Sequence, residues 1–160
     1  MLKIWNLEKI DLSVFNTSKV GSMSSMFNNC IKLTNINLSK WDTSKVKNMS
    51  YMFFGLDKVQ VFNLSSFKGE MVNETNHMFD GCTNLQYVDL SNFAAKLLTS
   101  ADSMFAKTTR LCHLDLSAMQ FKIPNTTAGS AFKMFDSCTD EIITVRNETY
   151  LTFLQGLYIH

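Results

Sequence analysis

The chain has 160 residues, of which 46% are hydrophobic and 18% are charged, and its formal net charge is +1. This length and composition are typical of one globular domain with a continuous core. The near-neutral charge argues against nucleic acid or an anionic membrane as a partner, and no apolar run approaches the ~20 residues of a membrane helix. We therefore expect neither nucleic-acid binding nor membrane insertion.

Residues 1–6 precede the first repeat and are predicted to form an N-terminal cap. Ile4 and Trp5 would cover the end of a stack of repeats, which otherwise exposes apolar core. The opening segment, MLKIWNLEKIDL, has neither the apolar stretch nor the cleavage site of a signal peptide. We expect a cell-surface or secreted protein if the chain is a fragment, and a cytoplasmic protein if Met1 is the native start.

Five copies of one sequence unit follow over residues 7–140. A Leu-Ser pair recurs at a constant interval, at Leu12, Leu38, Leu64, Leu90 and Leu116. A Met-Phe pair recurs at the same period and then once more after a longer interval, at Phe27, Phe53, Phe79, Phe105 and Phe135. A constant period of this length indicates a solenoid, in which each repeat buries its apolar faces against its neighbours.

Each unit has two halves with different apolar spacing. The first half of the second copy has apolar residues of strand type at Leu33, Ile36 and Leu38. Its second half has spacings of three, three and one, which suit a helical or 3₁₀-like turn, at Val46, Met49, Met52 and Phe53. We therefore predict one domain, residues 1–160, with the fold of an α/β repeat solenoid. It would be a right-handed solenoid of leucine-rich-repeat type, with five 26-residue rungs, a parallel sheet on one face and a cap at each end.

The repeat also resembles a known family. The pattern L-x-x-I-x-L-S matches the strand half of a leucine-rich repeat, and the second half, S-K-V-x-x-M-S-x-M-F-x-x-C, resembles the BspA-like leucine-rich repeat family of bacterial and protozoan surface proteins. The segment TSKV at 17–20 and 43–46 and the Met-Phe pairs carry this resemblance, which covers about Leu7 to Cys138. It implies a shared scaffold whose members differ in what they bind.

The end of the chain departs from the period. The fifth copy is longer by four residues, and the extra length falls at 122–129, around the single proline. We expect a loop there, free of the packing demands of the repeat. Four of its residues form a second candidate contact site: Lys122, Ile123, Pro124 and Asn125. Residues 141–160 are predicted to form a C-terminal cap of one strand and one helix, with Asn147 as the N-cap.

The four cysteines are predicted to be free thiols. Cys30, Cys82 and Cys138 share one column of the repeat, and Cys30 lies two copies from Cys82. Strands two apart in a ladder are separated by ~10 Å, whereas the Cα atoms of a disulfide lie within ~6.8 Å. We therefore expect buried thiols in this column and an exposed thiol at Cys112, which lies in a different column.

The strand positions between the buried leucines form the exposed face of the predicted sheet. A solvated sheet face is expected to be polar, but Val61, Tyr87 and His113 share one column and make an amphipathic strip of the kind enriched in interfaces. Together with Asp89 and Asp115 in a neighbouring column, they are the first candidate partner-binding site. Two alternatives remain open. Single exposed apolar residues are ordinary, and the Asp/Asn column could instead hydrogen-bond the backbone or the next rung.

Catalytic and metal chemistry find little support in the sequence. His113 lies two residues from Asp115, but no nucleophile accompanies the pair and a flat sheet face excludes no water. The three histidines, His77, His113 and His160, occupy different slots, and neither a C-x-x-C motif nor a glycine-rich phosphate loop occurs. We therefore expect no enzyme activity, no metal and no cofactor.

The remaining expectation is a monomeric, non-catalytic protein-binding module with another protein as its partner. The resemblance implies adhesion or another interaction at the cell surface. The alternative is an intracellular binder or inhibitor, for example one encoded by a phage or mobile element, that occludes a host protein. The lack of a signal peptide and the free thiols motivate this alternative.

Overall fold

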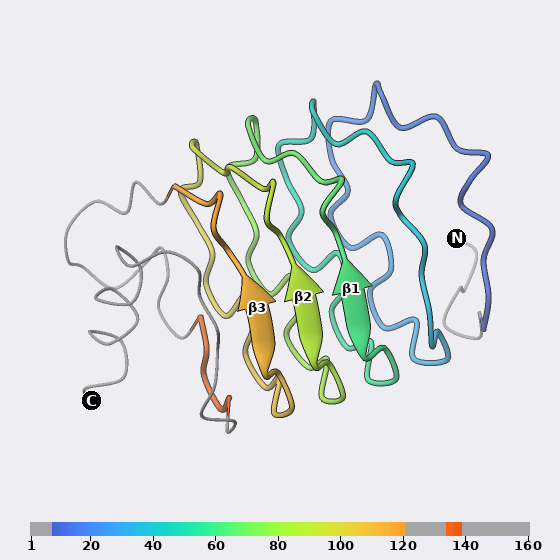
Figure 1. Ribbon diagram of the computed structural model, residues 1–160, viewed down its shortest axis with the longest axis vertical. Helices are drawn as coiled ribbons and strands as arrows, with labels where there is room; N and C mark the ends of the chain where they lie inside the picture. The colour runs from blue at the N-terminus through green and yellow to red at the C-terminus, as the bar shows by residue number, and fades with distance from the viewer. Residues whose placement is uncertain (1–7, 121–133, 139–160) are drawn as a thin grey trace.

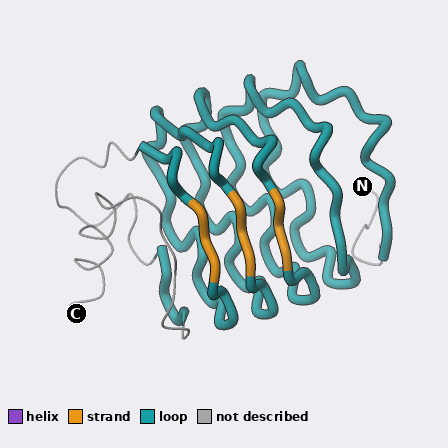
Figure 2. The backbone as a smooth tube through the Cα atoms, viewed as in Figure 1, coloured by secondary structure: helices purple, strands orange, loops and turns teal. Residues whose placement is uncertain are grey.

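The computed structural model describes residues 8–120 and 134–138. Within these residues the chain forms three short strands, β1 (Val61–Asn63), β2 (Tyr87–Asp89) and β3 (His113–Asp115). They make one open parallel sheet in the order β1-β2-β3 (Figure 1). The rest of the described chain consists of loops and turns (Figure 2).

Segments one repeat apart in the sequence lie side by side. On the sheet side Phe62 pairs with Val88, and Val88 pairs with Leu114. We call successive segments coil 1 (8–32), coil 2 (33–58), coil 3 (59–84) and coil 4 (85–110). On the side away from the sheet, isolated parallel bridges join all four coils, through Ser22, Asn48, Glu74 and Ser100.

The predicted α/β solenoid of five rungs is wrong. The described residues contain no helix, and only three short parallel strands in one open sheet. The half of coil 2 expected to form a helical or 3₁₀-like turn contains turns but no helix. Instead, the N–H groups of Met49, Tyr51 and Phe53 each donate to a carbonyl of coil 3 at 2.9 Å. Tyr51 also has a φ of 59°, a left-handed conformation that interrupts a right-handed helix.

Apolar spacing of three, three and one is satisfied here by tight turns. The N–H of Met52 donates to the carbonyl of Met49 at 3.2 Å, and the N–H of Phe54 donates to that of Tyr51 at 3.3 Å. The N–H groups of Met52 and Phe54 therefore bond within coil 2, whereas those of Met49, Tyr51 and Phe53 bond to coil 3. The predicted caps at 1–6 and 141–160 and the predicted loop at 122–129 lie outside the described residues.

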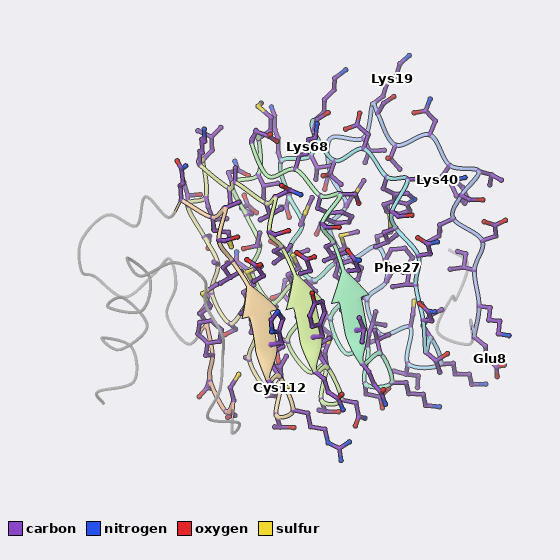
Figure 3. All side chains as sticks on the ribbon, viewed as in Figure 1. Glu8, Lys19, Phe27, Lys40, Lys68 and Cys112 are labelled. Carbon is purple, nitrogen blue, oxygen red and sulfur yellow. The ribbon has the colours of Figure 1, made fainter. Side chains whose placement is uncertain are left out.

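The core is a column of phenylalanine rings that runs through the stack. Consecutive ring centroids are 5.1 to 5.9 Å apart, along Phe27, Phe53, Phe79, Phe105 and Phe135. Phe53 and Phe79 are both 0% exposed, as the repeat predicts. Charged side chains lie outside this column. Figure 3 shows Lys19, Lys40 and Lys68 directed outward along one rim, whereas Phe27 lies inside the stack.

All four cysteines are free, which confirms the prediction of unpaired thiols. Cys30 and Cys82 are fully buried, Cys138 is half-buried, and Cys112 is exposed just before β3 (Figure 3). Burial raises the pKa of the Cys82 thiol to about 12. That thiol donates to the carbonyl of Phe53 at 3.1 Å, so it acts as a small core residue rather than a nucleophile.

Candidate binding surface

The strand-face strip consists of Val61, Tyr87 and His113, which pair in register on β1, β2 and β3. Their neighbours Phe62, Val88 and Leu114 are buried, so strand alternation places the strip on the outer face. The structure thus brings these three candidate residues together, as the repeat predicts. The Val61 side chain is 53% exposed.

The two rings of the strip are held against each other. The centroids of Tyr87 and His113 lie 4.6 Å apart with an interplanar angle of 2°, and both side chains are half-buried as a result. Stacked rings on a hydrogen-bonded sheet lose little conformational entropy when a partner covers them. The strip is therefore a rigid, partly apolar surface.

The neighbouring Asp/Asn column closes the turns that follow the strands. Oδ1 of Asn63 accepts from the backbone N–H of Ser65 at 3.2 Å, and Oδ1 of Asp89 accepts from that of Ser91 at 2.9 Å. Oδ1 of Asp115 accepts from Ser117 at 2.9 Å in the same way. These are Asx turns, in which a side chain caps its own backbone two residues on. One oxygen of Asp89 and of Asp115 is thus used by the fold, and their part in partner contact stays a prediction.

A groove that the sequence analysis missed opens beside Val61. It has a volume of about 730 Å³, and its two walls are residues 34–39 of coil 2 and β1 with its flanking residues. The residues that line the second wall are Lys58, Gln60, Val61, Asn63, Ser65 and Ser66. Figure 1 shows the front segment of coil 2 well separated from β1, whereas β1, β2 and β3 are evenly spaced. We call this feature the edge groove.

The signal for the edge groove lies in the inward column of the strands. That column contains Phe62 in coil 3 and aliphatic residues at the equivalent positions: Ile10, Ile36, Val88 and Leu114. The Phe62 ring lies 4.5 Å from Phe53 of coil 2 and 5.4 Å from Phe79 of coil 3, measured between centroids. A ring in an aliphatic column takes extra volume in a close-packed core, and we infer that this volume contributes to the separation of the front segments of coils 2 and 3.

A second hollow, polar and of about 420 Å³, lies on the side away from the sheet. Tyr51 and His77 line it, with ring centroids 4.7 Å apart, and Nδ1 of His77 lies 2.9 Å from Oδ2 of the buried Asp80. The Oγ of Ser50, also in the lining, is buried without a hydrogen-bond partner in the described structure. This hollow offers hydrogen-bonding groups, among them the hydroxyls of Ser24, Ser50 and Ser100.

The other predicted contact site, the loop residues Lys122, Ile123, Pro124 and Asn125, lies outside the described residues. Over the described part of the chain, no cluster of three or more His, Cys, Asp or Glu residues could hold a metal ion. The same residues contain no helix long and apolar enough to cross a membrane.

Comparison with known proteins identifies a family for this chain. The family model, described as Mycoplasma protein of unknown function, DUF285, matches residues 1–119. No curated protein and no solved structure matches the chain.

Proposed function

The chain belongs to the DUF285 family of Mycoplasma proteins of unknown function, and from its surface we propose that it is a non-catalytic protein-binding module. Its contact surface is the strand-face strip, flanked by the edge groove, and Val61 belongs to both. The partner is another protein, which the module holds without chemical change.

The observation that carries this proposal is the stacked Tyr87–His113 pair beside the exposed Val61. Aromatic residues with a polar tip are enriched at the centre of protein interfaces, and rigid ones cost little entropy on binding. A sheet face that served only as scaffold would need neither the rings nor Val61. The turns that follow the strands are closed by Asn63, Asp89 and Asp115, so the residues of the strip are not needed for that purpose.

Two settings fit such a module. The resemblance to the BspA-like family supports adhesion or another interaction at the cell surface. The free thiols support an intracellular binder or inhibitor that occludes a host protein, because unpaired cysteines are typical of reducing compartments. The identity of the captured partner separates the two settings.

The test is capture of partners by chemical cross-linking in source cells, followed by affinity measurement with the purified partner. Tyr87→Ala should weaken binding by about 30-fold, equivalent to ~2 kcal/mol, because it removes the larger ring of the strip. Leu97→Ala is the matched control, since Leu97 is 52% exposed but lies outside the strip and the groove. Equal affinities for both variants and the wild type would reject the strip as the contact surface.

A further inference from the structure

We propose that the edge groove takes an extended segment of the partner protein as an added parallel strand between coil 2 and β1. This inference rests on the proposed function and specifies how the partner is held. Backbone hydrogen bonds to both walls would supply the affinity, and the strand-face strip would contact the residues around the added strand.

The wall formed by β1 has free backbone groups that face the groove. In the β1–β2 pair, the N–H of Tyr87 donates to the carbonyl of Gln60 at 3.1 Å, and the N–H of Leu64 donates to the carbonyl of Asp89 at 3.0 Å. Gln60 and Leu64 therefore direct their backbone groups toward β2. Alternate residues of a strand serve opposite edges, so Val61 and Asn63 direct theirs into the groove.

The opposite wall is the matching segment of coil 2. Thr34, Ile36 and Leu38 lie one repeat before Gln60, Phe62 and Leu64, and we expect the same alternation to direct their N–H groups toward β1. The carbonyl of Leu38 accepts from the N–H of Trp41 at 3.0 Å, within coil 2. In the described structure no backbone–backbone hydrogen bond joins residues 34–38 to residues 60–64. The walls are bridged at one end, where the Oγ of Ser66 donates to the carbonyl of Leu38 at 3.4 Å.

The unpaired edge of β1 therefore faces a segment of coil 2, residues 34–38, that is a loop without backbone hydrogen bonds to β1. An unpaired edge is a template for another strand, and a segment between two edges can pair with both at once. Neighbouring strands are ~4.8 Å apart, so one added strand separates its two neighbours by ~10 Å. A strand that pairs on both sides also binds more selectively than one added to an outer edge, because both registers must match.

The lining defines the chemistry of the added segment. Its inward side chain would lie in the column of Ile36 and Phe62, which calls for an aliphatic residue of high strand propensity such as valine. Among the described residues of the lining, Lys58 is the one with a charged side chain, and it precedes β1 by three residues. The complementary segment therefore has an acidic residue about four positions before its central valine.

A labelled peptide with this pattern, acetyl-ESTTVTVS-amide, is the probe. Fluorescence anisotropy with the full chain should show saturable binding to the wild type and to Val61→Thr, which keeps the backbone N–H. Val61→Pro should weaken binding by about tenfold or more, because proline removes that donor. Proline is tolerated on an edge strand whose N–H faces away from its neighbour, so the sheet should remain intact.

A modified probe tests the same claim without changing the protein. N-methylation of the central valine, the fifth residue of the probe, removes one donor and should abolish binding, whereas N-methylation of its last serine should not. If Val61→Pro fails to fold by circular dichroism, this pair of peptides decides alone. No saturable binding of the probe up to about 1 mM, or binding that the central methyl group leaves unchanged, would overturn the inference.

The outcome can be separated from that of the proposed function. If Tyr87→Ala weakens capture of the partner protein but Val61→Pro does not, the strip is the contact surface and the added strand is rejected. If the probe binds as expected but Tyr87→Ala leaves partner affinity unchanged, the groove is retained and the strip is rejected.

Discussion

The two sides of the stack are held together differently, although one repeat builds both. On the side away from the sheet, parallel bridges run without a break from Ser22 through Asn48 and Glu74 to Ser100. On the sheet side the ladder starts only at β1, and coil 2 takes no part in it. A constant period therefore does not ensure backbone pairing on both sides of each coil.

On the sheet side no backbone hydrogen bond joins the strand-type segments of coils 1, 2 and 3 in the described structure, and between coils 2 and 3 one residue departs from its column. On the side away from the sheet, Met52 and Met78 repeat one residue type at one position of the unit, and both are fully buried. On the sheet side, Phe62 replaces an aliphatic residue and contacts the rings of both coils. The consequence is a stack that is closed on one side and open on the other between coil 2 and β1.

The largest loss of stability is expected from Phe53→Ala, because both sides of the stack depend on this side chain. Phe53→Ala removes a ring that stacks on Phe27 at 5.9 Å and on Phe79 at 5.4 Å. We expect a loss of ~3–5 kcal/mol in the free energy of unfolding, as for other large-to-small changes in a core. Urea denaturation measures this loss. Val14→Ala, at a side chain 78% exposed, is the control and should stay near the wild type. An unchanged midpoint for Phe53→Ala would mean that the phenylalanine column does not hold the coils together.

A smaller loss of stability is expected from removing a pair of hydrogen bonds that joins coils 2 and 3 at the rim. The buried Thr43 donates its hydroxyl to the carbonyl of Lys68 at 3.0 Å and accepts from the N–H of Lys68 at 2.8 Å. Thr43→Val keeps the shape and leaves two backbone groups without a partner, which should cost ~1–3 kcal/mol. These two hydrogen bonds join coils that lack strand pairing on the sheet side, so no strand pairing there compensates for their loss.

Thr43→Ser is the matched variant, because it keeps the hydroxyl and removes only the methyl group. Its free energy of unfolding should lie closer to the wild type than that of Thr43→Val. If Thr43→Ser is the more destabilised of the two, then packing of the methyl group, rather than the pair of hydrogen bonds, joins the coils at this point.

The sequence predicted the strands better than it predicted the turns. Alternation correctly placed Phe62, Val88 and Leu114 inside and the strand-face strip outside, because strand geometry has a period of two that side chains report directly. The helical interpretation of the second half was wrong because spacings of three, three and one also fit a chain of tight turns. Left-handed backbone at Tyr51 and His77 had no glycine or asparagine to mark it.

The edge groove could not be predicted from the repeat pattern, for a different reason. The main buried columns are apolar in coils 2 and 3 alike, with Thr75 as an exception, so periodicity treats the two coils as equivalent. The extra volume of the Phe62 ring becomes informative once its neighbours, Phe53 and Phe79, are known. The Asx turns were foreseeable in part, since the Asp/Asn column was expected to bond the backbone, and the structure identifies the serine two residues on as the donor.

The smallest effect on stability, and the sharpest test of the comparison, is expected from Phe62→Val. Valine restores the aliphatic column, so the front segment of coil 2 should approach β1 and extend the ladder. The hydrogen bonds gained should offset much of the packing lost, and the free energy of unfolding should fall by less than about 1.5 kcal/mol. Hydrogen exchange gives the direct measurement. The amides of Ile36 and Leu38 donate no backbone hydrogen bond in the described structure and should become protected, while Tyr51 and Phe53 stay protected as before.

Phe79→Val is the control, because it makes the same change at another fully buried ring. It should cost more, about 2–3 kcal/mol, and leave Ile36 and Leu38 unprotected. If these two amides exchange as fast in Phe62→Val as in the wild type, the ring does not hold the groove open. The opening would then have to come from the path of coil 2 itself.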